Sequence, residues 1–439
     1  MVGTGVDGVS RGQRAAGRVV PSVARLVREH RGRFDLADLT VHPDDEMMAF
    51  DVKHASTPAI AEMNYFRNGL VISDTLRSVV DQWCPGGPSR ILDFACGYGR
   101  ALRFTIQDFG ADRVWGSDIL PGAVRHIGDQ LGAHAVQSAG QPEDLSPQLD
   151  GPFDVIFVSS LFTHLPERTF TRWLQALYER LDPSGLLAFS VHGETLLPDE
   201  LELPPEGLLF GETTEIEALD TKDYGVAIVS EDFVAGAIKT ATGHDTYRRL
   251  PVTLAFGQDL YLVPRSGAED AGRLGGLVVR HGAQGHVDEC RVEQPGRLRL
   301  LGWATTQDGD VRARDVEIRI DDQLVARAPV GTERPDVAAR WIGAAPGADC
   351  LHSGWSTTVE LASDPDPHST VTFTARLSDG SLGVFWSSEL GELIGEPEGS
   401  ESPSLSVVQR VRATWHAEGA TGVARAVTRR LTGLLPKSS

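Results

Sequence analysis

The stretch ILDFACGYGR, residues 91–100, decides the fold. A short apolar run ends on Asp93 and breaks into a turn that contains Gly97 and Gly99, and Asp118 closes the next apolar run, VWGSD. Glycines let a backbone approach a ligand closely, and a carboxylate at the end of the second strand accepts hydrogen bonds from ribose hydroxyls. The pattern therefore predicts a nucleotide site at the end of a first and a second parallel strand.

Asp93 distinguishes between classes of cofactor. Its carboxylate would repel a pyrophosphate, whereas a ligand that carries an amine and a sulfonium would be attracted. The dinucleotide fingerprint also requires a small residue three positions after Gly99, where this chain has Leu102. The motif favours S-adenosylmethionine, and a nicotinamide-dependent oxidoreductase is the weaker alternative.

Helical periodicity alternates with strand-like runs from residue 58 to 195, which is typical of a parallel sheet with crossover helices. We expect helices over 59–83, 100–108, 121–131, 167–181 and 230–240. Strands are expected over 90–96, 112–118, 133–138, 153–159, 186–193, 246–256 and 257–265. The acidic stretch 196–225 has little pattern and predicts an inserted loop or lid.

The motif LDFACGYG and this order of elements resemble the class I S-adenosylmethionine-dependent methyltransferases, whose pattern is Asp-x-Gly-x-Gly-x-Gly after an apolar residue. Ala95 stands at the first glycine position. The resemblance covers about residues 58–265. It implies an α/β, Rossmann-like seven-stranded methyltransferase sheet, in which GQDLYLV would form the last, antiparallel strand.

The resemblance also implies roles for single residues. Asp93, Gly97 and Gly99 would surround the methionyl moiety of the cofactor, Asp118 would bind its ribose, and either Glu143 or Asp144 would lie near its adenine. The complete predicted cofactor set is Asp93, Ala95, Gly97, Gly99, Asp118, Ile119, Glu143, Asp144 and Ser159.

Three residues are candidates for the catalytic base. Methyl transfer is an in-line displacement, and a base assists when the acceptor is a hydroxyl. Because open α/β sheets bind ligands at the carboxyl ends of their strands, we consider His164, His192 and Asp259, which fall at that edge. His164 could instead begin the next helix, and Asp259 could bind backbone amides. No metal-ligand motif is present in the sequence, so no metal is expected.

The remainder of the chain has a different pattern. Residues 290–392 form short alternating segments that predict a small all-β sandwich domain. They resemble modules attached to bacterial glycan-modifying proteins, through Gly-Trp-Ala, IDDQLV and Arg-Pro-Asp-Val. Trp303, Trp341, Trp355 and Trp386 could stack on sugar rings, although filling the sandwich core is the favoured role.

Composition shifts predict the other boundaries. We expect a basic N-terminal extension over 1–57, the methyltransferase domain over 58–265, a linker over 266–289, and a linker with a basic amphipathic tail over 393–439. The basic ends could rest on an anionic membrane surface, dock on the acidic body or be mobile. The net charge of −20 disfavours nucleic acid as a partner.

The four cysteines show no disulfide spacing and no apolar run approaches the ~20 residues of a membrane span, so we expect a cytoplasmic protein. The resemblance implies a methyltransferase, and the scarcity of lysine, 4 residues against 37 arginines, suggests a bacterial source. We expect O-methylation of a glycan, glycolipid or secondary-metabolite hydroxyl. The alternative is a non-catalytic, methyltransferase-like adaptor whose sandwich binds carbohydrate or protein. An acceptor pocket blocked by residues 196–225 would favour the adaptor.

Overall fold

The computed structural model describes residues 21–31, 39–55, 58–197, 201–212, 221–279, 282–306, 311–321, 323–340, 349–364 and 366–394. Within them lie an α/β region and a β-rich region, joined by a short segment with helix α8 (Ala271–Gly276). The predicted tail over 393–439 and the first 20 residues fall almost entirely outside the described residues.

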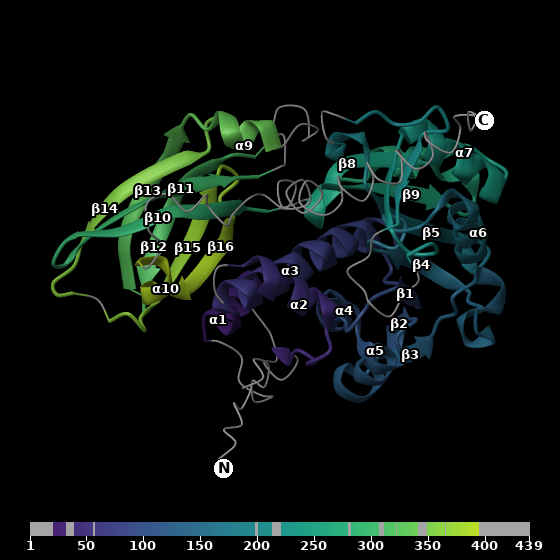
Figure 1. The fold of residues 1–439 in the computed structure, drawn as a ribbon, viewed down its shortest axis with the longest axis horizontal. Coiled ribbons are helices and arrows are strands. Elements are labelled where there is room, and N and C mark those ends of the chain that lie inside the picture. Colours follow the sequence, from purple (N-terminus) through teal and green to yellow (C-terminus); the bar gives the residue numbers. More distant parts are fainter. Residues whose placement is uncertain are drawn as a thin grey trace, which may run out of the picture.

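The α/β region is built on one seven-stranded sheet with the order β3-β2-β1-β4-β5-β9-β8 (Figure 1). Its strands are β1 (Ile91–Phe94), β2 (Val114–Asp118), β3 (His134–Gln137), β4 (Phe153–Val158), β5 (Leu181–Val191), β8 (Arg248–Leu254) and β9 (Gln258–Pro264). The first five pair in parallel, and β9 runs antiparallel to β5. The predicted Rossmann-like sheet with an antiparallel last strand is confirmed.

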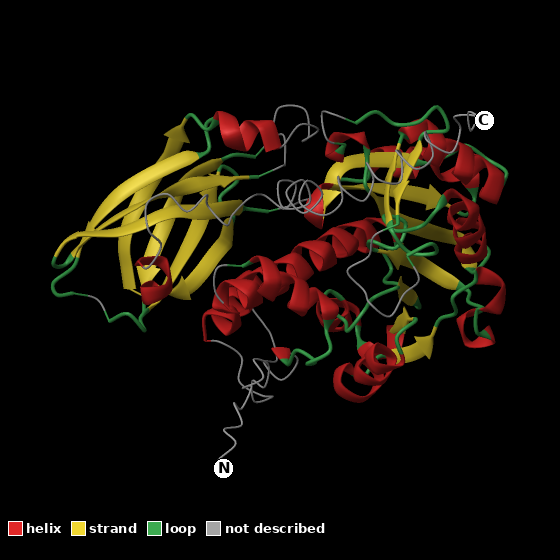
Figure 2. Cartoon of the chain, viewed as in Figure 1, coloured by secondary structure: helices red, strands yellow, loops and turns green. Residues whose placement is uncertain are grey.

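Helices cover both faces of this sheet (Figure 2). They are α3 (Pro58–Trp83), α4 (Leu102–Phe109), α5 (Pro121–His126), α6 (Glu167–Tyr178) and α7 (Glu231–Thr242). Along β4, Val155 and Phe157 pack into the cluster that contains α3, whereas Ile156 and Val158 pack into the cluster that contains α6 and α7. Since side chains alternate along a strand, a continuous apolar run is needed to fill both cores.

The structure differs from the predicted elements in three places. The helix expected over 121–131 changes to a π-helical turn over Ile127–Leu131, and β5 already begins at Leu181. The expectation of a patternless loop over 196–225 was wrong at β6 (Leu208–Gly211), which pairs with β7 (Val226–Val229). Each of these two strands is too short to show a period, and only their pairing makes them recognisable.

The β-rich region contains seven antiparallel strands in the order β10-β11-β14-β13-β12-β15-β16. They are β10 (Gln284–Gln294), β11 (Arg297–Thr305), β12 (Ala313–Ile320), β13 (Gln323–Thr332), β14 (Gly354–Glu360), β15 (Thr370–Leu377) and β16 (Leu382–Glu389), with the short helices α9 (Pro335–Arg340) and α10 (Leu390–Ile394). Trp303, Trp355 and Trp386 are buried, as expected for core residues, and Trp341 lies outside the described residues.

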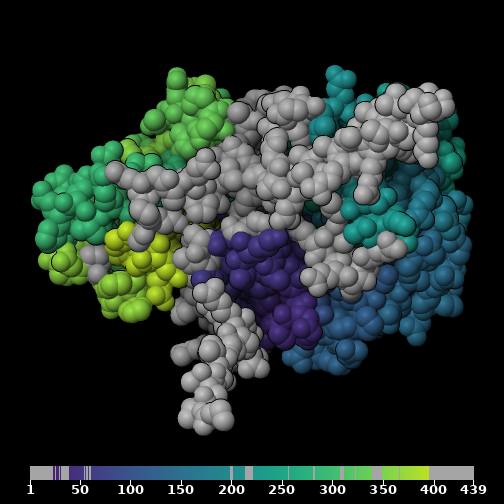
Figure 3. Space-filling model, in the orientation of Figure 1, coloured from purple at the N-terminus to yellow at the C-terminus, as the bar shows by residue number. Residues whose placement is uncertain are grey.

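The first helices of the chain lie between the two regions (Figures 1 and 3). Val23 and Leu26 of α1 (Pro21–Arg31) share an apolar cluster with Phe66 of α3 and Val384 of β16. Arg67 of α3 donates a hydrogen bond to the Gly285 carbonyl and lies over the Trp386 ring. The sandwich is therefore packed on the same helix that covers one face of the α/β sheet.

A search of the described helices for membrane-spanning segments finds none with the length and apolar character that a bilayer crossing requires.

Gly69 allows α3 to approach the turn that follows β1. A Cβ atom at Gly69 would lie 2.4 Å from the Arg100 carbonyl oxygen. We therefore expect Gly69→Ala to lower the free energy of unfolding by about 1–3 kcal/mol, because backbone on both sides must shift. Thermal unfolding of the purified variant measures this effect.

Gly236 of α7 is the matched control, because a Cβ atom there would meet no atom within 4 Å. Gly236→Ala should be neutral or stabilise the protein by up to about 1 kcal/mol, the usual helix-interior preference for alanine. Equal melting temperatures for Gly69→Ala and the unsubstituted protein would show that the close approach is not required.

Candidate cofactor and acceptor site

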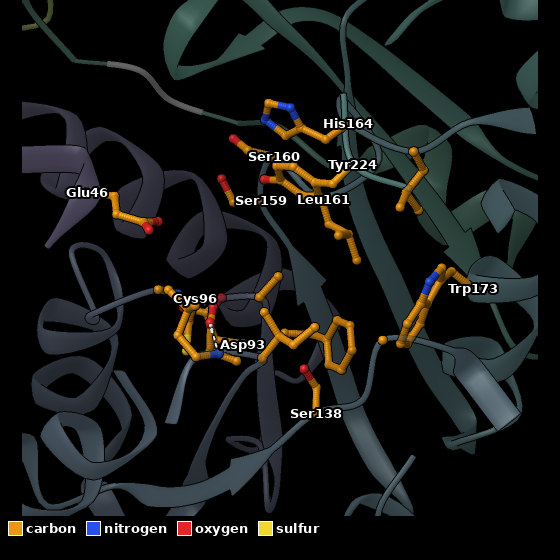
Figure 4. Close-up of a pocket in the computed structure, with 18 of the residues that line it drawn as sticks. Glu46, Asp93, Cys96, Ser138, Ser159, Ser160, Leu161, His164, Trp173 and Tyr224 are labelled. Carbon is orange, nitrogen blue, oxygen red and sulfur yellow. Dashed lines mark hydrogen bonds between the residues drawn. The ribbon is translucent and has the colours of Figure 1, made fainter. Parts of the chain in front are cut away.

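A pocket of about 420 Å³ opens at the carboxyl ends of β1, β2 and β4 (Figure 4). This edge includes the point between β1 and β4 where the strand order reverses, which is the usual ligand position in open α/β sheets. Eight of the twelve predicted site residues line it: the cofactor residues Asp93, Ala95, Gly97, Asp118, Ile119, Asp144 and Ser159, and the candidate base His164. The sheet order therefore gathers residues from β1, β2, β4 and the following loops around one cavity.

The backbone leaves β1 and β4 in unusual conformations on either side of this pocket. Ala95 and Gly97 have positive φ angles of 59° and 56°, and Ser160, after β4, has a φ of 68°. Such angles suit glycine and strain other residues, and they cluster at functional sites. Gly97 also has open space where a Cβ would stand, so a ligand can approach its backbone.

Asp118 fixes the shape of the turn after β1. Its Oδ2 accepts a hydrogen bond from the Gly97 amide at 2.8 Å, and its Oδ1 accepts one from the Leu120 amide at 2.9 Å. Burial raises the pKa of this carboxyl, and the backbone amides oppose that rise. A carboxylate has about four acceptor positions, so a ribose hydroxyl could use one that the backbone amides leave open.

Asp93 is a buried carboxyl group that forms no ion pair with any described residue. It is 2% exposed, and burial together with the neighbouring Asp118 raises its pKa to about 8. No described residue donates a hydrogen bond to its side chain. A buried charge is costly unless it is paired, so a positively charged ligand in this pocket would lower that pKa and stabilise the ionised form.

Two of the predicted cofactor residues lie outside the pocket lining. Gly99 serves the turn itself, since its φ is 78° and a Cβ would lie 2.5 Å from the Leu131 Cδ1. Glu143 is exposed and accepts a hydrogen bond from Arg172. Of the two alternatives for the adenine end, the structure places Asp144 in the lining.

His164 lies on the wall of the pocket opposite the glycine turn (Figure 4). Its Nδ1 donates to the Gly225 carbonyl at 2.6 Å, which leaves Nε2 as an acceptor, and its ring stacks on Tyr224 at 4.4 Å. Burial lowers the pKa of His164 to about 4, so the imidazole is neutral near pH 7. His164 can therefore accept a proton or a hydrogen bond at Nε2.

The other two candidates for the base lie outside the lining of this pocket. The ring of His192 is buried 6.3 Å from that of His164, and burial lowers its pKa to about 3. Asp259 is fully buried, forms an ion pair with Arg249 and accepts a hydrogen bond from the Val252 amide at 2.9 Å. Asp259 thus has the backbone-binding role that was considered as its alternative.

Sequence reasoning missed the contribution of the chain before residue 58. Asp45, Glu46 and Met47, at the start of helix α2 (Glu46–His54), also line the pocket. The available signal was HPDDEMM, in which an aspartate precedes a helical turn as an N-cap. This signal predicts a helix start but not a contact with the pocket, because the stretch lies far in sequence from the glycine motif.

The pocket residues fit S-adenosylmethionine on their own chemistry. The cofactor carries an ammonium and a sulfonium, which match the unpaired carboxylate of Asp93, and ribose hydroxyls, which match Asp118. Open space at Gly97 accommodates a ligand against the backbone. Within the described residues, no group of three or more His, Cys, Asp or Glu side chains could hold a metal ion.

Comparison with known proteins agrees with this geometry. Residues 91–185 match a family profile described as "Methyltransferase domain". A search of curated proteins finds no significant match.

Among solved structures, the chain is similar to the 1,6-didemethyltoxoflavin-N1-methyltransferase of Burkholderia thailandensis, with 16% identity, a TM-score of 0.31, and coverage of 44% of this chain and 77% of that one. It is also similar to the plantazolicin methyltransferase BpumL, with 13% identity, a TM-score of 0.33, and coverage of 50% and 95%. Both were crystallised with S-adenosylhomocysteine.

Similarities at this level of identity concern the fold alone, so the function must be argued from the residues of this chain. The strand order, the antiparallel β9 and the Asp93–Gly99 turn are all present, and the matched profile spans β1 to the start of β5. The α/β region of this chain therefore carries a methyltransferase domain on a Rossmann-like sheet, with a pocket whose residues fit S-adenosylmethionine.

Proposed function

We propose that the protein transfers a methyl group from S-adenosylmethionine to a hydroxyl of a small-molecule or glycan acceptor. The observation that carries this proposal is the buried carboxylate of Asp93, unpaired among the described residues, beside the turn that Asp118 fixes. A pyrophosphate-containing cofactor would be repelled by these two carboxylates, whereas a cationic one relieves their burial.

Each side of the pocket has a distinct part in this reaction. When bound, S-adenosylmethionine supplies a methyl carbon that is already activated by its sulfonium. Asp93 and Asp118 hold the cofactor at the ends of β1 and β2, and the wall formed by His164 and Tyr224 orients the acceptor. Fixing this approach and excluding water are the main requirements of an in-line displacement.

His164 is the best-placed base. As the acceptor oxygen forms its bond to the methyl carbon, the hydroxyl proton passes to Nε2 of His164, and the electrons of the carbon–sulfur bond remain on sulfur. The Nδ1–H donated to Gly225 fixes the tautomer in which Nε2 can accept that proton. The neutral ring favoured by burial is the form that this role needs.

An acceptor side blocked by residues 196–225 would favour the adaptor alternative. The described part of that stretch instead contributes Asp223 and Tyr224 as a wall, and the cavity persists beside them. This observation supports catalysis over the adaptor.

The class of acceptor is inferred by analogy. We infer a glycan, glycolipid or secondary-metabolite acceptor from the resemblance of the sandwich to modules on glycan-modifying proteins, with the sandwich used for binding or docking. A cytoplasmic location belongs to the same proposal. Contact with an anionic membrane surface is proposed for the C-terminal basic end alone, because the apolar residues Val23 and Leu26 of α1 are buried against α3 and β16.

Parallel calorimetric titration with S-adenosylmethionine, S-adenosylhomocysteine and NAD tests the function. We expect binding of the first two and none of NAD. Asp118→Ala should weaken S-adenosylhomocysteine binding by about 1–3 kcal/mol, since it removes charge-assisted hydrogen bonds and frees the Gly97 turn. If neither S-adenosylmethionine nor S-adenosylhomocysteine binds, the proposed function is refuted. If Asp118→Ala binds S-adenosylhomocysteine with unchanged affinity, Asp118 is not part of the cofactor site.

Binding should also release protons from the pocket. Asp93, with a pKa of about 8, is mostly protonated at pH 7 in the free protein, and a bound cation favours its ionised form. We expect the unsubstituted protein to release more protons on binding S-adenosylhomocysteine at pH 7 than Asp93→Asn does. Titrations in two buffers of different ionisation enthalpy count these protons, and equal release would exclude Asp93 as the group that responds.

Once an acceptor is identified with a labelled methyl group, His164→Ala should lower turnover by at least about 100-fold, the usual range for a lost general base. S-adenosylhomocysteine affinity should stay within about twofold, because His164 lies on the acceptor wall. The matched variant His192→Asn alters a buried histidine outside the lining and should retain turnover. Full activity of His164→Ala would end its candidacy.

A further inference from the structure

The start of helix α2 is fastened to the turn after β1 by a buried chain of polar groups. Asp45 caps the helix, since its Oδ1 accepts hydrogen bonds from the Met47 and Met48 amides at 3.0 and 3.2 Å. Its other oxygen, Oδ2, accepts one from the Tyr65 hydroxyl at 2.5 Å, and Tyr65 is itself fully buried in α3. The position of α2 is therefore set by α3 as well as by its own cap.

Arg103 extends this chain to the cofactor turn. This residue is 1% exposed, and its guanidinium donates through Nε to the Gly99 carbonyl at 3.0 Å and through Nη1 to the Thr40 carbonyl at 3.1 Å. His42 stacks on the Tyr98 ring at 4.7 Å. The segment 39–46 thus lies against the glycine turn through contacts on both its backbone and its side chains.

This arrangement places the Glu46 side chain inside the pocket. Figure 4 shows its carboxylate pointing into the cavity, on the side opposite Trp173. No described residue donates a hydrogen bond to it or forms an ion pair with it. Partial burial, Asp118 and Asp45 all disfavour its charge and raise its pKa to about 7. Among the described residues, the Glu46 carboxylate therefore has other carboxylates nearby and no cationic partner.

We propose that Glu46 binds the α-ammonium group of the cofactor, so that α2 supplies a third wall of the cofactor site. This inference rests on the proposed function. S-adenosylmethionine brings two cationic groups, and they are separated along its length. The sulfonium must face the acceptor wall with His164, whereas Glu46 lies on the same side of the cavity as Cys96 of the glycine turn in Figure 4 and close enough to Asp118 to feel its charge.

The amino-acid end of the cofactor is therefore the end within reach of Glu46. At this position the ammonium of the ligand would supply the cationic partner that no described residue gives Glu46. An ammonium donates up to three hydrogen bonds, so Asp93 and Glu46 can both bind it.

Binding of three ligands distinguishes an ammonium-binding role of Glu46 from a general effect of its substitution on the fold. S-adenosylmethionine and S-adenosylhomocysteine carry the α-ammonium, and 5′-methylthioadenosine keeps the adenosine and the sulfur but lacks the amino-acid carbons. We expect Glu46→Gln to weaken both amino-acid-bearing ligands by about 10-fold or more, as for a lost charge-assisted hydrogen bond, and to leave 5′-methylthioadenosine within about twofold.

Asp44→Asn is the matched control, because it removes the same charge two residues earlier from a side chain that is 78% exposed and outside the lining. It should bind all three ligands like the unsubstituted protein. The proposal is overturned if Glu46→Gln leaves S-adenosylhomocysteine unchanged, weakens 5′-methylthioadenosine equally, or affects S-adenosylmethionine alone, which would place Glu46 at the sulfonium. Failure of the unsubstituted protein to bind any of them would instead refute the proposed function.

Discussion

The structure depends on the hydrogen bond between the Asp118 carboxylate and the Gly97 amide. It ties the end of β2 to the turn after β1, and it holds that turn in the left-handed conformations of Ala95 and Gly97. Arg103 binds the same turn from the other side through the Gly99 carbonyl. The backbone between the two strands is thereby fixed in a strained shape before any ligand arrives, and such preorganisation reduces the ordering cost of binding.

Electrostatics give this preorganised turn its selectivity. Asp93, Asp118 and Glu46 all meet at the pocket, and burial raises the pKa of each carboxyl. Keeping several carboxylates together is unfavourable in the free protein, and a cationic ligand recovers that energy. The same charges that exclude a pyrophosphate therefore favour a cofactor with an ammonium and a sulfonium.

The helices before β1 connect this site with the rest of the molecule. Helix α3 approaches the cofactor turn closely at Gly69, and its residue Arg67 contacts the sandwich at Gly285 and Trp386. Val384 of β16 is buried in the same apolar cluster as Phe66 of α3. The sandwich is thus packed on the helix that also supports the methyltransferase pocket, which couples the stability of the two regions.

Local patterns in the sequence were sufficient for most of the α/β fold. The apolar run before Asp93, the glycines after it and Asp118 at the next strand end predicted the strands, the turn and the class of cofactor, because each depends on neighbours within a few residues. The alternating segments after residue 290 likewise predicted an antiparallel β region. Short strands such as β6 escaped because pairing, and not periodicity, defines them.

Only the tertiary structure decided which polar residues meet. Asp144 and Glu143 are adjacent in sequence, yet one lines the pocket and the other pairs with Arg172 on the surface. His164 and His192 both follow strands, and only the former reaches the cavity. Glu46 enters the site from α2, 47 residues before Asp93, through the contacts of Asp45, Tyr65 and Arg103. A sequence determines local conformation through nearest neighbours, whereas a site is assembled by long-range packing whose partners no local pattern records.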